Sequence, residues 1–133
     1  RLHGLGKEIY YYQYTDEELR HLHELVKPFE AGGKEVYVLF NNLAMYDDGT
    51  RFMRYIESGK FPILTGAVGL ESIKSVIERT RYPVAKSVLL KRLGWKLVEL
   101  EEGKQTRLDK LLKNLPSKSY SSVKEVLREI KSL

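Results

Sequence analysis

The run Glu35-Val36-Tyr37-Val38-Leu39-Phe40 restricts the fold of this chain more than any other stretch. Beyond its first residue it is apolar throughout, without the alternation of a strand that has one wet face. Such runs are typical of strands covered on both faces, as in a parallel sheet between helices. Two glycines precede the run and two asparagines end it. We therefore predict a buried strand over 36–40 and an α/β fold.

Helices are predicted on both sides of this strand. Thr15-Asp16-Glu17-Glu18 has the form of a capping box at a helix start. Apolar residues then recur at helical spacing, at Leu19, Leu22, Val26 and Phe29. Pro28 and the glycine pair after it indicate the helix end. Beyond the strand, Asp47-Asp48-Gly49 predicts a turn, and 51–58 predicts a short helix closed by Gly59.

A stretch rich in glycine and proline, 61–69, divides the chain into two predicted domains, 1–62 and 63–133. The second domain is expected to be mostly helical, with a β-hairpin within 95–108. Pro83 suits the first turn of one helix and Gly94 its C-terminal cap. The other predicted helices cover 71–80, 108–115 and 122–130, the last opened by a Ser122–Glu125 capping box.

The composition bounds the class of protein. Hydrophobic residues make up 42% and charged residues 31%, a globular balance, and no apolar run approaches membrane-spanning length. No signal-peptide pattern opens the chain, and it begins at Arg1 with its first methionine at Met45, so we expect a fragment or a processed product. The absence of cysteine excludes disulfides, thiolate nucleophiles and Cys-based zinc sites, and favours a reducing, cytoplasmic compartment. Abundant Lys, Arg and Glu favour a heat-adapted source.

Charge is divided unevenly between the two predicted domains. Residues 1–62 carry 8 Lys/Arg and 10 Asp/Glu, whereas residues 63–133 carry 15 and 8. The net charges are therefore −2 and +7. A basic domain of this kind fits an anionic partner, although a solvated charged face produces the same composition.

Three pieces of the first domain, in order, resemble the C-terminal segment of the YecE-like family, a TIM-barrel group of unknown function. They are Arg1-Leu2-His3-Gly4, then Tyr12-Gln13-Tyr14 with Asp16-Glu17-Glu18-Leu19, and Val36-Tyr37-Val38-Leu39-Phe40-Asn41-Asn42. The resemblance implies that residues 1–4 end the seventh barrel strand and that 36–41 form the eighth. The fold is then a βαβα piece, the last two units of a barrel, followed by the helical domain. Residues 82–130 also resemble a small uncharacterised bacterial domain, through Tyr82-Pro83, Leu115-Pro116 and Tyr120-Ser121.

Sites in such barrels lie at the C-terminal strand ends, where a phosphate is often held. The resemblance therefore implies a ligand-binding rim formed by Arg1, His3, Asn41 and Asn42. Arginine offers a two-pronged donor, histidine exchanges a proton near neutral pH, and asparagine both donates and accepts. Such residues would suit a phosphate or a sugar-like ligand. The alternative is that they cap backbone groups at the strand ends.

Other chemistry-bearing residues favour structural roles. Gly4-Leu5-Gly6-Lys7 has the composition of a phosphate cradle, but a tight loop explains it better. The tyrosines from Tyr10 to Tyr14 are expected to pack rather than stack on bases. His21 and His23 lie two residues apart, which places them on different helix faces, so we predict no metal site. No nucleophile–base pair identifies a reaction, and no cofactor is predicted.

The second domain offers a different function. Its cations could track a nucleic-acid backbone, with Trp95 as a stacking ring, although Trp95 is expected in the core. The residues chosen for this interface are Lys91, Arg92, Lys96, Lys104 and Arg107.

Two hypotheses follow: a barrel segment that binds a phosphate or sugar-like ligand, or a non-enzymatic module that binds nucleic acid or an acidic protein. A two-stranded parallel piece also leaves strand edges uncovered. We therefore expect strand 36–40 to pair with a missing barrel segment or with a second copy.

Overall fold

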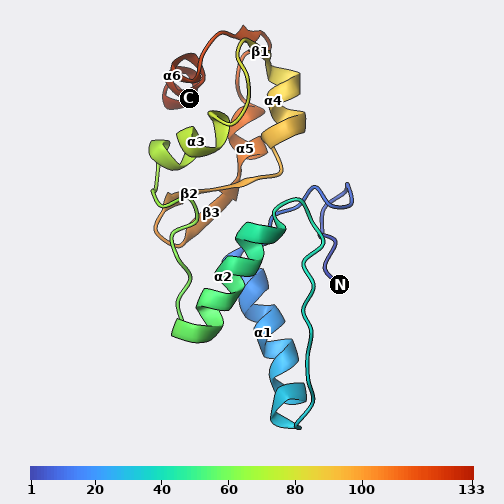
Figure 1. Ribbon diagram of the computed structural model, residues 1–133. Helices are drawn as coiled ribbons and strands as arrows, with labels where there is room; N and C mark the ends of the chain where they lie inside the picture. Colours follow the sequence, from blue (N-terminus) through green and yellow to red (C-terminus); the bar gives the residue numbers. More distant parts are fainter. The chain divides into compact units, whose positions relative to one another are not determined.

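The computed structural model describes residues 1–133 and forms two compact units, Arg1–Pro62 (unit 1) and Ile63–Leu133 (unit 2). The chain is a mixed α/β protein of helices and two small two-stranded sheets (Figure 1). No helix combines the length and the apolar character that crossing a membrane requires.

Unit 1 is built on two packed helices, α1 (Asp16–Ala31) and α2 (Met45–Ser58) (Figure 1). The predicted capping box is confirmed, since the Thr15 hydroxyl accepts from the Glu18 N–H and the Glu18 carboxylate accepts from the Thr15 N–H. Of the two predicted end signals, the glycine pair is confirmed and Pro28 is not, because α1 continues past Pro28 to Ala31 and Gly32 is its C-terminal cap. The Pro28 carbonyl still accepts from the N–H of Gly32, so only the hydrogen bond of the proline itself is missing.

Helix α2 begins earlier than predicted. The expected turn at Asp47-Asp48-Gly49 lies inside its first two turns, and the helix starts at Met45 rather than at residue 51. Carboxylates near a helix N-terminus are favoured by the helix dipole, which explains why the two aspartates are tolerated there. Gly59 closes the helix in a left-handed conformation, as predicted.

The predicted strand is the main correction in unit 1. Residues 36–40 form no regular strand and pair only through an isolated parallel bridge between Leu2 and Phe40. Val38 and Phe40 pack against the core of Tyr14, Leu19 and Phe52. The opposite face is uncovered, with Tyr37 78% and Leu39 51% exposed. The segment therefore has one buried face, because no further strand or helix of unit 1 lies over the other.

Unit 2 contains four short helices around one hydrophobic core (Figure 1). They are α3 (Leu70–Ile77), α4 (Lys86–Leu93), α5 (Leu108–Leu112) and α6 (Val123–Lys131). The fully buried Leu89, Leu108 and Tyr120 lie in this core. Trp95 is not part of it, contrary to expectation, and its indole N–H donates to the Arg92 carbonyl.

Short strands complete unit 2. The predicted hairpin is confirmed as β2 (Leu97–Glu101) and β3 (Lys104–Arg107), which pair antiparallel. A second pair, β1 (Val84–Ala85) with β4 (Ser119–Tyr120), was not predicted. Pro83 was expected in the first turn of a helix. It lies instead before strand β1, which directly precedes α4. Gly94 is the C-terminal cap of α4, as predicted.

Candidate functional site

The two chain segments that carry the predicted ligand residues lie side by side in unit 1. The N–H of Leu2 donates to the carbonyl of Leu39, and the N–H of Asn41 donates to the carbonyl of Leu2, both at 2.8 Å. This pattern is parallel, so the two segments end on the same side. Successive side chains of extended backbone point to opposite faces.

Alternation then decides which predicted residues share a face. Leu2 and Phe40 both pack against the helices, so their neighbours His3 and Asn41 are directed to the opposite face. Arg1 lies two residues before His3 and belongs to the same face. Arg1 and Asn41 are exposed and His3 is half-buried. Alternation thus directs three of the four predicted residues to the same face.

A strained residue lies next to this trio. Tyr10 has φ 75°, the left-handed region that bulky side chains rarely adopt, at an expense of about 1–3 kcal/mol. Its N–H donates to the His3 carbonyl and its carbonyl accepts from the N–H of Leu43, both at 2.9 Å. The Tyr10 and His3 rings also meet edge to face, with centroids 5.6 Å apart. Tyr10 therefore fastens the ends of both segments, and no signal in the sequence indicated this role.

Asn42 is not part of the exposed trio, which corrects its assignment as a ligand residue. Its side chain is 3% exposed, because alternation turns it toward the helices. The side-chain amide donates to the Tyr12 carbonyl and to the Asp48 carboxylate, each at 2.7 Å. Its side-chain oxygen is buried without a hydrogen-bond partner. Asn42 thus holds the tyrosine segment in place.

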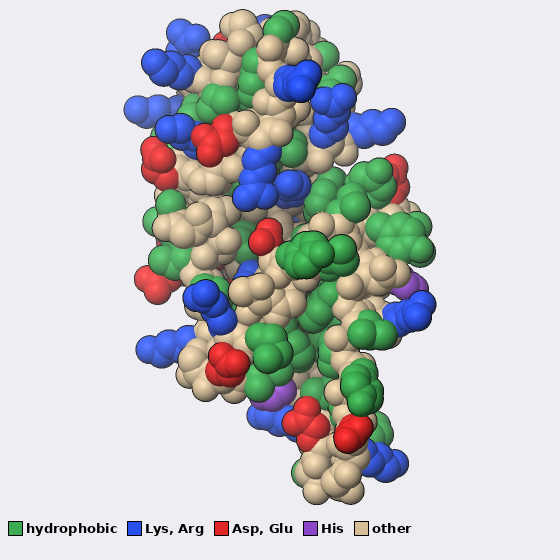
Figure 2. Space-filling model, in the orientation of Figure 1, with side chains coloured by type: hydrophobic (Ala, Val, Ile, Leu, Met, Phe, Trp, Pro, Cys, Tyr) green, Lys and Arg blue, Asp and Glu red, His purple; other side chains and the backbone are tan.

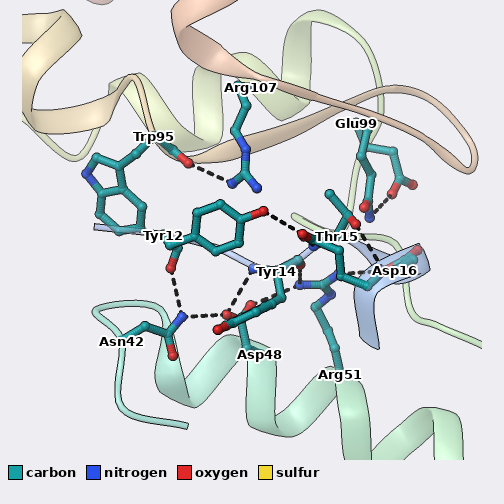
Figure 3. A network of polar contacts seen from close by, with 12 residues as sticks. Tyr12, Tyr14, Thr15, Asp16, Asn42, Asp48, Arg51, Trp95, Glu99 and Arg107 are labelled. Atoms are coloured by element: carbon teal, nitrogen blue, oxygen red, sulfur yellow. Dashed lines mark hydrogen bonds and ion pairs between the residues drawn. The ribbon is translucent and has the colours of Figure 1, made fainter. Parts of the chain in front are cut away.

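Asp48 is the centre of the buried polar cluster that Asn42 joins. Asn42 and Arg51 approach its carboxylate from two sides (Figure 3). The N–H of Tyr14 also donates to it, at 3.1 Å. Burial raises the pKa of the Asp48 carboxyl to about 6, against the opposing effect of these hydrogen bonds and of the Arg51 charge. The cluster fixes the backbone of residues 12–14 below the exposed face.

Arg51 connects this cluster to the start of α1. Its guanidinium donates to the Tyr14 carbonyl and pairs with both Asp48 and Asp16. The side chain is almost fully buried, and its Nε has no hydrogen-bond partner. The sequence offered one signal for this pair, the spacing of three residues between Asp48 and Arg51, but the predicted turn obscured it.

The glycine loop between the two segments is shaped by packing. Gly4 has φ 109°, and a Cβ there would lie 2.6 Å from the Cβ of Tyr12. The Gly4 N–H donates to the Tyr14 hydroxyl, so it does not point into an open anion cradle. Tyr12 and Tyr14 meet edge to face at 5.1 Å. The loop is therefore tight, as expected, and Tyr12 and Tyr14 are packed as predicted, whereas Tyr10 and Tyr11 are 41% and 45% exposed.

The histidines of α1 also have packing roles. His23 contacts the rings of Phe52 and Tyr55 edge to face, at centroid distances of 6.2 and 5.6 Å. His21 is exposed. No group of three or more His, Asp or Glu side chains is arranged to hold a metal ion.

The structure brings together only part of the predicted basic interface in unit 2. The Arg107 guanidinium donates to the Trp95 carbonyl (Figure 3), and the Lys96 ammonium lies 5.4 Å from the Trp95 ring centroid. Arg92 accepts from the same indole and is, like Lys91, in the last turn of α4. Lys104 is apart from this group, at the hairpin turn, where it pairs with Glu101 at 2.7 Å.

A match to a known protein family lies in unit 2. The model of a family of unknown function, DUF5789, matches residues 67–133. No curated protein and no solved structure matches the chain. The matched region covers none of the residues on which the YecE-like resemblance rests.

Proposed function

The chain belongs to the DUF5789 family of unknown function, and from that starting point we propose that unit 1 supplies its ligand site. In this proposal unit 1 corresponds to the closing segment of a YecE-like barrel. It binds a phosphate or a sugar-like ligand at the ends of its two parallel segments. The observation that carries the proposal is the Leu2–Phe40 bridge, which sets His3 beside Asn41.

The chemistry of the exposed face suits such a ligand. Arg1 offers a planar fork for phosphate oxygens, and Asn41 offers both a donor and an acceptor. His3 adds a ring nitrogen that donates or accepts according to its protonation. No acidic residue lies within residues 1–4 or 41–43, so the face has no nearby carboxylate in sequence to repel an anion.

Two structural features support a site at this position. The segments are parallel, and sites in barrels of parallel strands form where such strands end. The strained Tyr10 backbone joins the same ends, and strain of this kind gathers at functional sites. The buried Asp48 cluster holds the supporting loop, which keeps the face rigid from below.

An NMR titration of the whole chain tests this proposal. Inorganic phosphate and, separately, glucose are added, and backbone amide shifts are followed. We expect saturable shifts at residues 2–4 and 41–43, lost in His3→Ala and Asn41→Ala and retained in the control His21→Ala, whose side chain is exposed on α1. Shifts confined to lysines of unit 2, or no saturable shifts with either probe, would overturn the proposal.

A second function has one specific observation in its favour, the surface charge of unit 2. Lys and Arg side chains are spread over the unit that contains α3 to α6 (Figure 2). Lys91, Arg92, Lys110 and Lys113 are exposed and form no ion pair. We infer that this surface binds a polyanion, with nucleic acid as the ligand to test first.

Salt dependence separates this function from the first. Binding of a fluorescent single-stranded DNA should weaken steeply between 50 and 200 mM salt, as counterion release requires, by roughly tenfold or more. The double variant Lys91→Ala/Arg92→Ala should weaken binding further, whereas Lys7→Ala in unit 1 should not. Salt-independent binding, or equal effects of both variants, would contradict a role for unit 2.

A further inference from the structure

The extended segment 35–40 has one paired edge and one open edge. The backbone of Leu2 forms hydrogen bonds with Leu39 and Asn41, on either side of Phe40, and these bonds make the paired edge. In extended backbone, the N–H and C=O groups of Val36, Val38 and Phe40 then point to the other edge. None of these groups forms a hydrogen bond. The open edge is therefore a row of backbone donors and acceptors at the spacing of a strand.

Natural edge strands usually carry features that prevent pairing with another chain, such as charges, prolines or bulges. Between Val36 and Phe40 the sequence contains no charge, no proline and no glycine. The exposed side chains on this stretch, Tyr37 and Leu39, are instead large and apolar. Exposed apolar residues continue past the segment at Leu43 and Tyr46. Such a surface favours burial against a partner.

We propose that the open edge of segment 35–40 pairs antiparallel with the same edge of a second copy of the chain. The two copies are related by a twofold axis at Val38, so that the interface is made by one self-complementary patch. The proposal rests on the geometry of unit 1 alone and does not require a ligand at His3 and Asn41.

The sequence fits this register. Val38 faces Val38 of the second copy, and Val36 faces Phe40, so the residues with unpaired backbone groups exchange hydrogen bonds with one another. On the exposed face, Tyr37 lies opposite Leu39 of the second copy, an aromatic–aliphatic pair of the kind that stabilises sheets. Twofold symmetry forms this pair twice.

The charges next to the segment do not oppose this partner. The only charged residues next to the apolar stretch are Lys34 and Glu35, both at its first end. Antiparallel pairing places them opposite Asn42 and Asn41 of the second copy, so no like charges meet. Glu35 of each copy then lies beside Asn41 of the other. In the dimer this carboxylate lies next to the candidate site, where it disfavours phosphate and leaves the sugar-like ligand unopposed.

Sedimentation equilibrium of the whole chain, over a wide range of concentrations, measures the association. The variant Tyr37→Lys introduces a charge opposite Leu39 and should raise the dimer dissociation constant roughly tenfold, because two cross-strand pairs are lost. Tyr46→Lys is the matched control, since Tyr46 is 80% exposed and lies outside the register. The control should dimerise like the parent chain. Both substitutions are at exposed positions, and circular dichroism checks that the variants fold.

Cross-linking tests the register. The chain has no cysteine, so Leu39→Cys introduces a single exposed thiol, which the register places about 7–8 Å from its copy on the same face. A short thiol cross-linker should capture the Leu39→Cys dimer and leave Tyr46→Cys monomeric at the same concentration. A parent chain that stays monomeric at every concentration overturns the proposal. Equal cross-linking of the two variants overturns the register, and neither result bears on the phosphate and glucose titration.

Discussion

The side-chain amide of Asn42 donates to the Asp48 carboxylate at 2.7 Å, and both side chains are shielded from solvent. Asn42 follows the extended segment and Asp48 lies in α2, so this hydrogen bond joins a loop to a helix. The same amide also donates to the Tyr12 carbonyl. One asparagine therefore connects the three parts of unit 1 that meet beneath His3 and Asn41.

Asn42→Ala should destabilise unit 1 by about 1–3 kcal/mol, because it leaves the Tyr12 carbonyl and the Asp48 carboxylate short of a donor. Urea unfolding followed by NMR signals of Phe52 measures the change. The neighbouring Asn41→Ala is the control, since Asn41 is exposed, and should change stability by less than about 0.5 kcal/mol. Equal effects of the two substitutions would show that Asn42 has no special structural role.

The pH dependence of unit 1 should have an unusual sign. The pKa of Asp48 rises from 3.8 to about 6 on folding, so between these values the folded chain holds more protons than the unfolded chain. The stabilisation that Asp48 adds to the free energy of unfolding is therefore fully present below pH 4 and is lost as the pH rises through 6. The two pKa values differ by an amount worth on the order of 3 kcal/mol.

Urea unfolding of unit 1 at pH 4 and pH 7 tests this sign. The parent chain should show the loss between the two pH values, and Asp48→Asn should not, since the amide does not titrate. Asp47→Asn retains the buried carboxyl of Asp48 and removes only the smallest of the effects that raise its pKa, so this control should keep most of the loss. If the parent chain and Asp48→Asn respond equally to pH, another group is responsible.

Unit 2 should respond to acid in the opposite sense. Hydrogen bonds from the Ser121 hydroxyl and N–H, and from Lys118, lower the pKa of the Glu125 carboxyl to about 2. Its contribution to stability is present above pH 4.5 and is lost as the pH falls toward 2. Glu125→Gln should make unit 2 less sensitive to acid, measured by the helical circular dichroism signal between pH 5 and pH 2. Glu129 lies 3.6 Å from the Lys118 ammonium and forms no hydrogen bond with Ser121, so Glu129→Gln should respond to acid like the parent chain.

Two nearby glycines should differ in their tolerance of alanine. At Gly4, φ 109° and the Tyr12 Cβ at 2.6 Å both oppose a side chain, so Gly4→Ala should destabilise unit 1 by about 1–3 kcal/mol. Gly6 has no positive φ, and its Cβ would meet the edge of the Tyr12 ring at 3.1 Å, which requires a shift of only a few tenths of an ångström, and the Tyr11 carbonyl at an ordinary 3.7 Å. Gly6→Ala should therefore be nearly neutral. Similar losses at both positions would contradict the packing account of this loop.

Local features of the fold were predictable from the sequence, whereas long-range ones were not. The Thr15 cap and the β2–β3 hairpin depend on residues a few positions apart, and the sequence predicts both. The hydrogen bonds of Asp48 include one from Tyr14, 34 residues away. Local signals could not report this contact and wrongly predicted a turn at Asp48. The exposure of Tyr37 depends on what lies over the segment, which the apolar run itself does not report.

The candidate site was predictable in part. The resemblance implied that His3 and Asn41 would be neighbours, and the Leu2–Phe40 bridge places them so. Alternation along extended backbone already separates Asn41 from Asn42, so the burial of Asn42 could have been inferred once the strand was accepted. Tyr10 could not, because its strained conformation results from bonds to both segment ends.

The central claim is that Leu2 and Phe40 form a parallel bridge that sets His3 beside Asn41. Amide hydrogen exchange, measured by NMR at micromolar concentration, tests it directly. The amides of Leu2 and Asn41 should exchange slowly, because each donates at 2.8 Å across the bridge, while the amides of Val38 and Phe40 exchange fast. Fast exchange at Leu2 and Asn41, or contacts between backbone protons in an antiparallel pattern, would contradict the account.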